Sequence, residues 1–410
     1  MWLLRNIICF LVLFSLSCGH KTEVGHGDKT GEKIKIGVEG PLTGEYALEG
    51  QGFKKAIELL AEQLNAEGGI LGKKVEIIIQ DDRGDPQEAS NAAAKLVDQK
   101  VIAVIGSYNS GASEPASKVY NEHNILHIIP SSTATRITTK GYKKLFRVCF
   151  LDDRQGSYIA NFTATRLSAR NIAIIHDNST YAKGLADWTK KYLEELKAEI
   201  VFFDAIDPKG QDFKPLLTKM KEKKPDAIIF TGYYGQAGLL VKQTRDLGIK
   251  APFISGNAVN NPEYVKIAGL ESAKGSFIIT EPLPQDLDNP GAKKLVTDFK
   301  AKYGHEPQSV WTMMAADAFN ILIKAIKETK STDPSILADY LHKLKDYQGV
   351  TGTIQGFDEK GDRLGSVHVA YIVDETGKFL LYKEKKDTDD KKEVTVEVKT
   401  KEPDVNPAKK

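Results

Sequence analysis

The sequence predicts an α/β protein with two lobes, each built around a parallel sheet, and three observations support this fold class. From Lys33 onwards, short β-branched segments alternate with segments of helical periodicity. The alternation restarts after Asp152, and the part expected to fold, residues 33–383, has the length of two domains. Because 41% of the 410 residues are hydrophobic, each lobe can bury a core.

The first half predicts four strands joined by helices. The strands are expected at residues 34–38, 75–79, 101–105 and 125–129. Apolar residues at helical spacing predict a helix from Phe53 to Leu64, which the Gly68-Gly69 pair ends. The Asp85-Pro86 pair starts a second helix, because proline suits a first helical turn, and a third starts at about Gly111. Apolar strands separated by helices favour a parallel sheet covered on both faces.

The second half repeats the pattern, and Glu281 to Pro284 then interrupt it. Strands are expected at residues 172–175, 200–203, 227–230, 253–254, 367–373 and 379–382. Helices are expected at residues 188–196, 237–247, 292–303, 310–327 and 334–344. In open α/β sheets, ligands bind beyond the carboxyl ends of the strands, so the loops that follow the strands are the place to look for a site.

Both ends of the chain differ in character from the folded part. Residues 1–17 have one positive charge and a short apolar run, which predicts an export signal peptide too short to span a bilayer permanently. Cys18 directly after it resembles a bacterial lipoprotein box and predicts a lipid anchor; the alternative is an ordinary signal peptide with a chance cysteine. Residues 18–32 are expected to form a flexible tether, and residues 384–410 a disordered charged tail.

Charge and cysteine content exclude several classes. The net charge of +2 suggests neither nucleic-acid binding nor a basic membrane patch, so membrane contact is expected only through the anchor. After loss of Cys9 with the signal and lipidation of Cys18, Cys149 is alone, and no intrachain disulfide is expected. Cys149 is interpreted as a small buried hydrophobic residue.

Two hydroxyl-rich loops follow the third and fourth predicted strands. Ser110 precedes a helix in the first loop, and Ser131 and Thr133 lie in the second. Exposed N–H groups and the positive end of the helix dipole favour an anion at such a place, so together the loops predict a carboxylate site. Tyr108 and Asn109 of the first loop are further candidates. The alternative is that the hydroxyls only cap helices.

Signatures of enzymes and metal sites are weak. The chain contains no Gly-x-Ser-x-Gly elbow, no Walker-type phosphate loop and no complete Gly-x-Gly-x-x-Gly motif. His123 and His127 have a spacing of four but run into a predicted strand, which argues against zinc. Asp81 and Asp82 are interpreted as turn or cleft-edge residues. We expect no catalytic residue, no metal and no cofactor.

A set of collinear motifs runs from Ile34 to about Tyr382. They are Gly40-Pro41-Leu42-Thr43-Gly44, Asn65-Ala66-Glu67-Gly68-Gly69-Ile70-Leu71-Gly72, Asp81-Asp82 with Asp85-Pro86, Ile105-Gly106-Ser107, Pro130-Ser131-Ser132-Thr133, Leu151-Asp152-Asp153-Arg154-Gln155-Gly156, His176-Asp177 with Tyr181 and Gly184, and Gly361-Asp362. In these motifs the chain resembles type I periplasmic solute-binding proteins of the branched-chain amino acid (leucine/isoleucine/valine) ABC transporter class.

The resemblance implies two lobes joined by a three-strand hinge, with a ligand clamped between them. Lobe one would be residues 33–151 plus 281–349, and lobe two residues 152–280 plus 350–383. By position in the motifs, Ser110, Ser131 and Thr133 would hold the ligand carboxylate. Tyr181 and Tyr233 would close over the ligand from lobe two; ordinary interface packing is the alternative for both.

One departure concerns the ligand ammonium. Asn257 stands where amino-acid binders of this class carry an acidic residue. An unpaired buried charge costs about 3–5 kcal/mol, a factor of roughly a hundred or more in affinity. Glu49 or Asp152 would therefore have to supply the charge, or the ligand lacks an ammonium, as amides, ureas and small carboxylates do.

These expectations combine into one function. The chain is expected to be a monomeric lipoprotein in the periplasm or on the outer face of the cytoplasmic membrane, where it delivers a small carboxylate-bearing ligand, a branched-chain amino acid or an analogue, to the membrane permease of an ABC importer. The alternatives are a ligand-sensing receptor subunit of the same fold and an enzyme.

Overall fold

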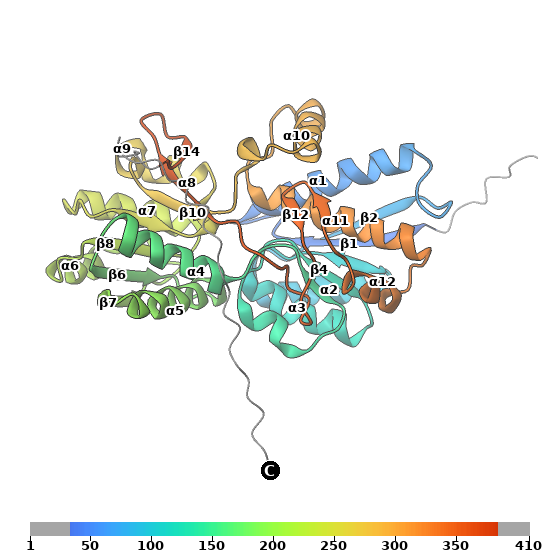
Figure 1. The fold of residues 1–410 in the computed structure, drawn as a ribbon, viewed down its shortest axis with the longest axis horizontal. Helices are drawn as coiled ribbons and strands as arrows, with labels where there is room; N and C mark the ends of the chain where they lie inside the picture. Colours follow the sequence, from blue (N-terminus) through green and yellow to red (C-terminus); the bar gives the residue numbers. More distant parts are fainter. Residues whose placement is uncertain (1–32, 384–410) are drawn as a thin grey trace, which may run out of the picture.

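The computed structural model of the chain describes residues 33–383. These residues form two α/β lobes that lie side by side, with chain segments passing between them (Figure 1). The expectations for residues 1–32 and 384–410, which include the signal peptide, the lipidation of Cys18 and the charged tail, lie outside the described residues. Within the described part, no helix has the length and apolar character needed to span a membrane.

The first lobe contains a five-stranded parallel sheet in the order β2-β1-β3-β4-β5. Its strands are β1 (Ile34–Gly40), β2 (Val75–Asp81), β3 (Ala103–Ile105), β4 (Leu126–Ile129) and β5 (Leu145–Arg147). In the register, Ile36 of β1, which lies between β2 and β3, is beside Ile77 and Ala103. Four of these strands match the predicted ones to within two residues, and β5 was not predicted.

Helices cover both faces of this sheet (Figure 1). They are α1 (Ala47–Ala66), α2 (Pro86–Asp98), α3 (Ser110–Glu122), α10 (Pro290–Tyr303), α11 (Val310–Thr329) and α12 (Pro334–Leu341), with a 3-10 helix η1 (Thr135–Lys140). Asp85 caps α2 by accepting from the N–H groups of Gln87 and Glu88, which confirms the predicted start at Asp85-Pro86. Most side chains of α11 are buried, and it packs against α1.

The second lobe contains a seven-stranded sheet in the order β14-β13-β10-β9-β8-β6-β7. Its strands are β6 (Asn171–His176), β7 (Glu199–Ala205), β8 (Ala227–Thr231), β9 (Phe253–Ser255), β10 (Phe277–Thr280), β13 (Val369–Val373) and β14 (Phe379–Leu381). Strands β6 to β10 are parallel, as predicted. At one edge β13 and β14 run antiparallel, because a short turn at Asp374 joins them and a parallel pair would need a long crossover.

Helices of the second lobe follow the same α/β alternation. They are α4 (Asp152–Asn161), α5 (Thr180–Glu195), α6 (Lys214–Glu222), α7 (Tyr234–Asp246), α8 (Glu263–Ala268) and α9 (Leu270–Ala273), with the short helices η2 (Phe162–Arg166), η3 (Asn257–Val259) and η4 (Pro284–Asp286). The predicted fold class, two lobes with α/β sheets, is confirmed. Helices α4 and α6 and strand β10 were not predicted.

The chain passes between the lobes three times. The first passage joins β5 to α4, and the second leads from β10 through η4 to α10. Figure 1 shows α4, β10 and α10 at these places. The domain boundaries stay a prediction, but hydrogen bonds favour a later third passage than Val350. Strand β12 (Gly352–Ile354) pairs with β11 (Tyr347–Gly349), and Asp362 then bonds to Arg147 of β5. Residues up to Asp362 therefore contact the first lobe.

Cys149 lies in the first of these passages. It is buried and unpaired, and its thiol donates to the Ser132 carbonyl oxygen at 3.7 Å. Burial raises the pKa of this thiol. The interpretation of Cys149 as a small buried residue is confirmed.

Candidate functional site

The predicted loops meet at a small cavity between the two lobes. The space inside it that is open to water-sized molecules is about 10 Å³, roughly what a single water molecule needs, so the surrounding side chains nearly fill the cavity. The lining residues are Tyr108, Ser110, Ser131, Thr133, Tyr181, Tyr233, Asn257, Ala258 and Trp311. Seven of these are residues that the sequence singled out. Because the cavity is nearly filled, an amino acid would enter only if the lobes move apart.

Two predicted residues do not line the cavity. Asn109 is the residue before α3, and its side chain makes no cap hydrogen bond to that helix. Glu49 lies on α1, and its carboxylate is held by other residues, as described below. The structure thus does not bring these two side chains to the cavity wall.

The amino end of α3 differs from the capped helix starts in this fold. Helices α2 and α5 are capped by the side chains of Asp85 and Ser179, whereas α3 has no side-chain cap. Its first N–H groups and the positive end of its dipole are therefore available beside the cavity. The Ser110 hydroxyl accepts from the Ala134 N–H at 3.3 Å, which leaves its own proton free to donate. The capping alternative does not hold at this helix.

The second hydroxyl loop is tied to the first. The Ser131 Oγ lies 3.1 Å from the Ser107 carbonyl oxygen and 3.3 Å from that of Tyr108, so its proton is used within the protein. Thr133 accepts a hydrogen bond from the Asp152 N–H at its carbonyl oxygen, at 3.0 Å. This bond connects the loop to the start of α4 and so to the second lobe.

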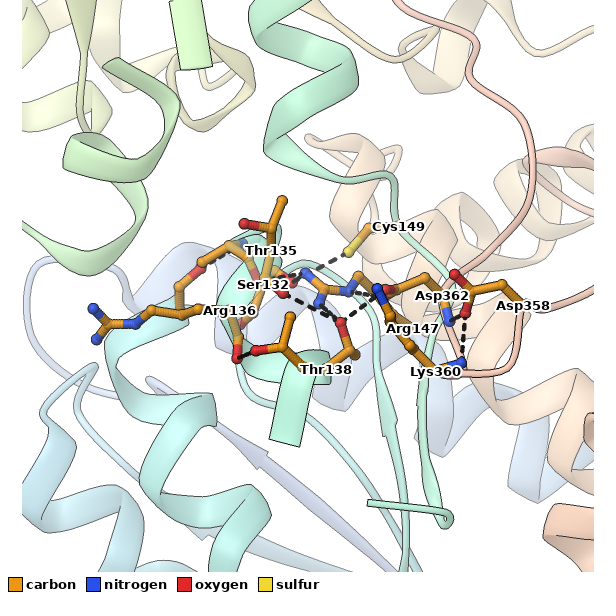
Figure 2. A network of polar contacts seen from close by, with 12 residues as sticks. Ser132, Thr135, Arg136, Thr138, Arg147, Cys149, Asp358, Lys360 and Asp362 are labelled. Atoms are coloured by element: carbon orange, nitrogen blue, oxygen red, sulfur yellow. Dashed lines mark hydrogen bonds and ion pairs between the residues drawn. The ribbon is translucent and has the colours of Figure 1, made fainter. Parts of the chain in front are cut away.

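A buried guanidinium holds the backbone on both sides of Thr133 (Figure 2). Arg147 donates to the carbonyl oxygens of Ser132 at 2.7 Å and Ala134 at 3.0 Å. The same group forms an ion pair with Asp362 at 2.8 Å. Arg147 therefore fixes the conformation of the loop that presents Thr133.

Aromatic rings from both lobes form much of the remaining wall. The ring centroids of Tyr108 and Tyr233 lie 5.8 Å apart, and those of Tyr181 and Tyr233 lie 5.4 Å apart. Trp311, at the start of α11, lies 6.4 Å from Tyr108. The sequence did not single out Trp311, because a tryptophan inside a predicted helix gives no indication of which face the helix turns to the other lobe.

Asn257 lies between a tyrosine and a second buried acid. Its Oδ1 accepts from the Tyr181 hydroxyl at 3.1 Å, and its Nδ2 lies 3.4 Å from both carboxylate oxygens of Glu281. Burial raises the pKa of Glu281. His368 lies 3.6 Å away, but burial lowers its pKa to about 3, so it does not neutralise the acid. From the sequence alone, Glu281 is interpreted only as part of the interruption at residues 281–284. Its contact with Asn257 was not predicted.

Glu49 and Asp152, the two acids proposed to supply the charge that Asn257 lacks, have different environments. Glu49 accepts from Asn261 Nδ2 at 2.8 Å and from the Ser309 hydroxyl at 2.6 Å. Asp152 is fully buried, and neither of its carboxylate oxygens has a partner with hydrogen-bond geometry. Burial raises the pKa of Asp152 to about 7, although the nearby Thr133 hydroxyl and Arg147 lower it. Neither acid lines the cavity, but Asp152 adjoins the lining residue Thr133 and is the one whose carboxylate oxygens lack a partner.

Direct hydrogen bonds join the two lobes around the cavity. The Tyr234 hydroxyl donates to the Glu45 carbonyl oxygen at 2.5 Å, and Gln236 Nε2 donates to the Glu45 carboxylate at 2.9 Å. Asn261 of the second lobe donates to Glu49 of the first, as given above. The lobes are therefore in contact, with the cavity enclosed between them.

Metal ligation has no support in the described part of the chain. Among residues 33–383, no group of three or more His, Cys, Asp or Glu side chains is placed to hold a metal ion. His127 lies beside the carbonyl oxygen of Gly106 at 2.6 Å, and burial lowers its pKa to about 4.

Known proteins share both the sequence and this architecture. Residues 33–378 match the family described as periplasmic binding protein. The chain is 34% identical over 331 residues to the leucine-, isoleucine-, valine-, threonine-, and alanine-binding protein of Pseudomonas aeruginosa, which covers 81% of this chain and 87% of that protein.

Two solved structures are similar to the whole described part. The leucine-binding protein LivK of Thermotoga maritima has a TM-score of 0.80 and 32% identity, covering 85% of this chain and 98% of that one. The branched-chain amino acid transporter substrate-binding protein LivJ of Streptococcus pneumoniae, in complex with isoleucine, has a TM-score of 0.77 and 34% identity, again covering 85% and 98%.

Proposed function

Since this chain belongs to the periplasmic binding protein family, we propose that it captures a small carboxylate-bearing solute outside the cytoplasm and delivers it to an ABC importer. The proposed solute is an amino acid of the branched-chain class or a close analogue, in line with the ligands named for its relatives. The observation that carries the proposal is the cavity enclosed between the lobes and lined by hydroxyl and aromatic side chains.

In this proposal the carboxylate of the solute binds at the amino end of α3. The uncapped N–H groups and the free proton of the Ser110 hydroxyl support an anion there, and Thr133 lies on the same wall. Ser131 contributes by joining the two loops, because its proton already bonds to carbonyl oxygens of the first loop.

The ammonium group would pair with Asp152. Its two carboxylate oxygens are buried and unpartnered, and it adjoins the lining residues Thr133 and Tyr181. Glu49 is already engaged by Asn261 and Ser309, so we assign it to contact between the lobes instead. Asn257 would orient the Tyr181 hydroxyl without supplying charge.

The mechanism we propose is closure of two lobes around the solute, stabilised because the solute contacts both. The closed form would be the one that the membrane permease recognises. We also propose that Cys18 carries a lipid anchor, that the protein is a monomer and that it catalyses no reaction.

The proposal is tested by calorimetry on the purified protein with leucine, isoleucine, valine, threonine and alanine. At least one should bind. Replacing Ser110 with Ala should weaken binding of that ligand by roughly tenfold to a hundredfold, because one hydrogen bond to a charged group is lost. Ser117→Ala is the matched control on the same helix, since its hydroxyl bonds to the Glu114 carbonyl oxygen away from the cavity. Equal affinity of both variants and the parent would refute the assigned carboxylate site.

A further inference from the structure

We propose that this site selects solutes whose distal end carries a hydrogen-bond acceptor, because two residues that line the cavity, Tyr108 and Trp311, carry buried donors without a partner. The inference rests on the proposed function and narrows its ligand class. A hydroxyl-bearing or carbonyl-bearing side chain would be preferred to an aliphatic one of the same shape.

Both donors are buried polar atoms without a partner in the described structure. Tyr108 is 4% and Trp311 is 2% exposed, and neither the Tyr108 hydroxyl nor the Trp311 indole N–H makes a hydrogen bond. Buried polar groups in proteins are nearly always hydrogen-bonded, and exceptions call for an explanation. Both residues line the same cavity, and a solute with an acceptor would satisfy them there.

The Trp311 indole N–H and the Tyr108 hydroxyl determine whether the ligand atom that pairs with them must accept or donate a hydrogen bond. An indole N–H donates and cannot accept, so Trp311 is satisfied only by an acceptor. A tyrosine hydroxyl can do both, but its neighbour Glu49 is already bonded to Asn261 and Ser309 and no hydrogen bond joins it to Tyr108. An acceptor oxygen within hydrogen-bond distance of either group would therefore satisfy it.

The rings that carry these donors pack toward α1 and α11. The Tyr108 ring packs against Phe53 of α1 at 6.4 Å and against Trp311 of α11 at 6.4 Å. Ser110 and Asp152 instead lie at the starts of α3 and α4. If the carboxylate of an amino acid binds at Ser110 and its ammonium at Asp152, its side chain would lie toward Tyr108 and Trp311, and an aliphatic side chain there would leave both donors unsatisfied.

The test compares ligands that match in shape and differ in polarity. We expect threonine to bind at least tenfold more tightly than valine, or asparagine at least tenfold more tightly than leucine. Tyr108→Phe removes one donor without changing the ring, and Trp311→Phe removes the other. Each should reduce the preference by threefold or more. Tyr303→Phe is the control, because its hydroxyl bonds to the Lys55 carbonyl oxygen outside the cavity.

The possible outcomes separate the inference from the function beneath it. Binding of valine and leucine as tight as that of threonine and asparagine would overturn the inference and leave the proposed function standing. A preference for the polar ligands that survives both substitutions would also overturn the assignment to these donors. Failure of every amino acid to bind would overturn the proposed function, and this inference with it.

Discussion

Asp152 combines complete burial with two carboxylate oxygens that have no hydrogen-bond partner. A buried acid favours its neutral form until a positive group arrives, and burial is the main reason that its pKa is raised to about 7. An ammonium ligand would favour the ionised form. Under the proposed pairing, ligand binding and loss of this proton would therefore be coupled.

This coupling predicts a pH dependence. At pH 5 Asp152 is mostly protonated in the free protein, so amino-acid affinity should rise roughly tenfold per pH unit up to about pH 7 and level off above. The stability of the free protein should change with pH in the opposite direction to the ligand affinity. Because the folded pKa lies above the ordinary value of 3.8, stability should fall as pH rises from about 4 to about 7.

Calorimetry in two buffers of different ionisation enthalpy measures the released proton directly. Asp152→Asn should lose the pH dependence and weaken amino-acid binding by roughly a hundredfold. Asp187→Asn, which alters an exposed acid paired with Lys183, is the control and should change neither. A pH-independent affinity in the parent protein would rule out Asp152 as the partner of the ammonium.

At the residue scale, sequence patterns found the loops but not all their neighbours. Ser110, Ser131 and Thr133 were predictable because the carboxyl ends of parallel strands share one sheet edge. Trp311 and Glu281 were not, because they reach the site from elements far away in sequence. Asn257 was recognised as a departure, but its contact with Glu281 depends on packing between β9 and β10.

At the scale of elements, Arg147 is a support for the ligand loop and not a ligand group. It is fully buried, and its ion pair with Asp362 lies between β5 and the segment before the third passage (Figure 2). Strand β5 itself has three residues and was missed, because so short a segment has no periodicity to read and forms only by pairing with β4.

Removing this guanidinium should be strongly destabilising. Arg147→Ala leaves Asp362 buried without its counter-charge, and we expect the free energy of unfolding to fall by about 3–5 kcal/mol. Urea denaturation followed by circular dichroism measures it. The control is Lys183→Ala, which breaks the exposed pair with Asp187 and should cost less than about 1 kcal/mol. A loss below about 1 kcal/mol for Arg147→Ala would contradict the assigned role.

At the scale of the whole molecule, the sequence predicted two lobes from chain length and from the restart of the α/β alternation. The antiparallel edge of the second sheet and the late third passage were not predictable. The latter depends on the contacts of Asp362 with Arg147 and of β12 with β11, which only the assembled fold brings together.

Hydrogen bonds between the lobes should contribute to ligand retention without touching the ligand. Gln236→Ala removes the bond from Gln236 Nε2 to Glu45, so we expect affinity to fall by roughly twofold to tenfold through faster dissociation. Stopped-flow fluorescence measures the rate. Gln63→Ala is the control, because Gln63 bonds to Asp298 within the first lobe. Dissociation as slow as in the parent would show that this bond does not hold the closed form.

The tie between Arg147 and Asp362 also limits where the molecule can bend. Arg363, the next residue, donates to the Val148 carbonyl oxygen at 3.0 Å and so clamps the third passage to the first. The chain before Arg363 is thereby bound to the first lobe, which presents Thr133. In the proposed closure, rotation would be taken up after these bonds, in residues 364–368, together with residues 149–151 and 281–283. The loop that presents Thr133 would then keep its shape while the lobes move, because Arg147 bonds to the backbone on both sides of it.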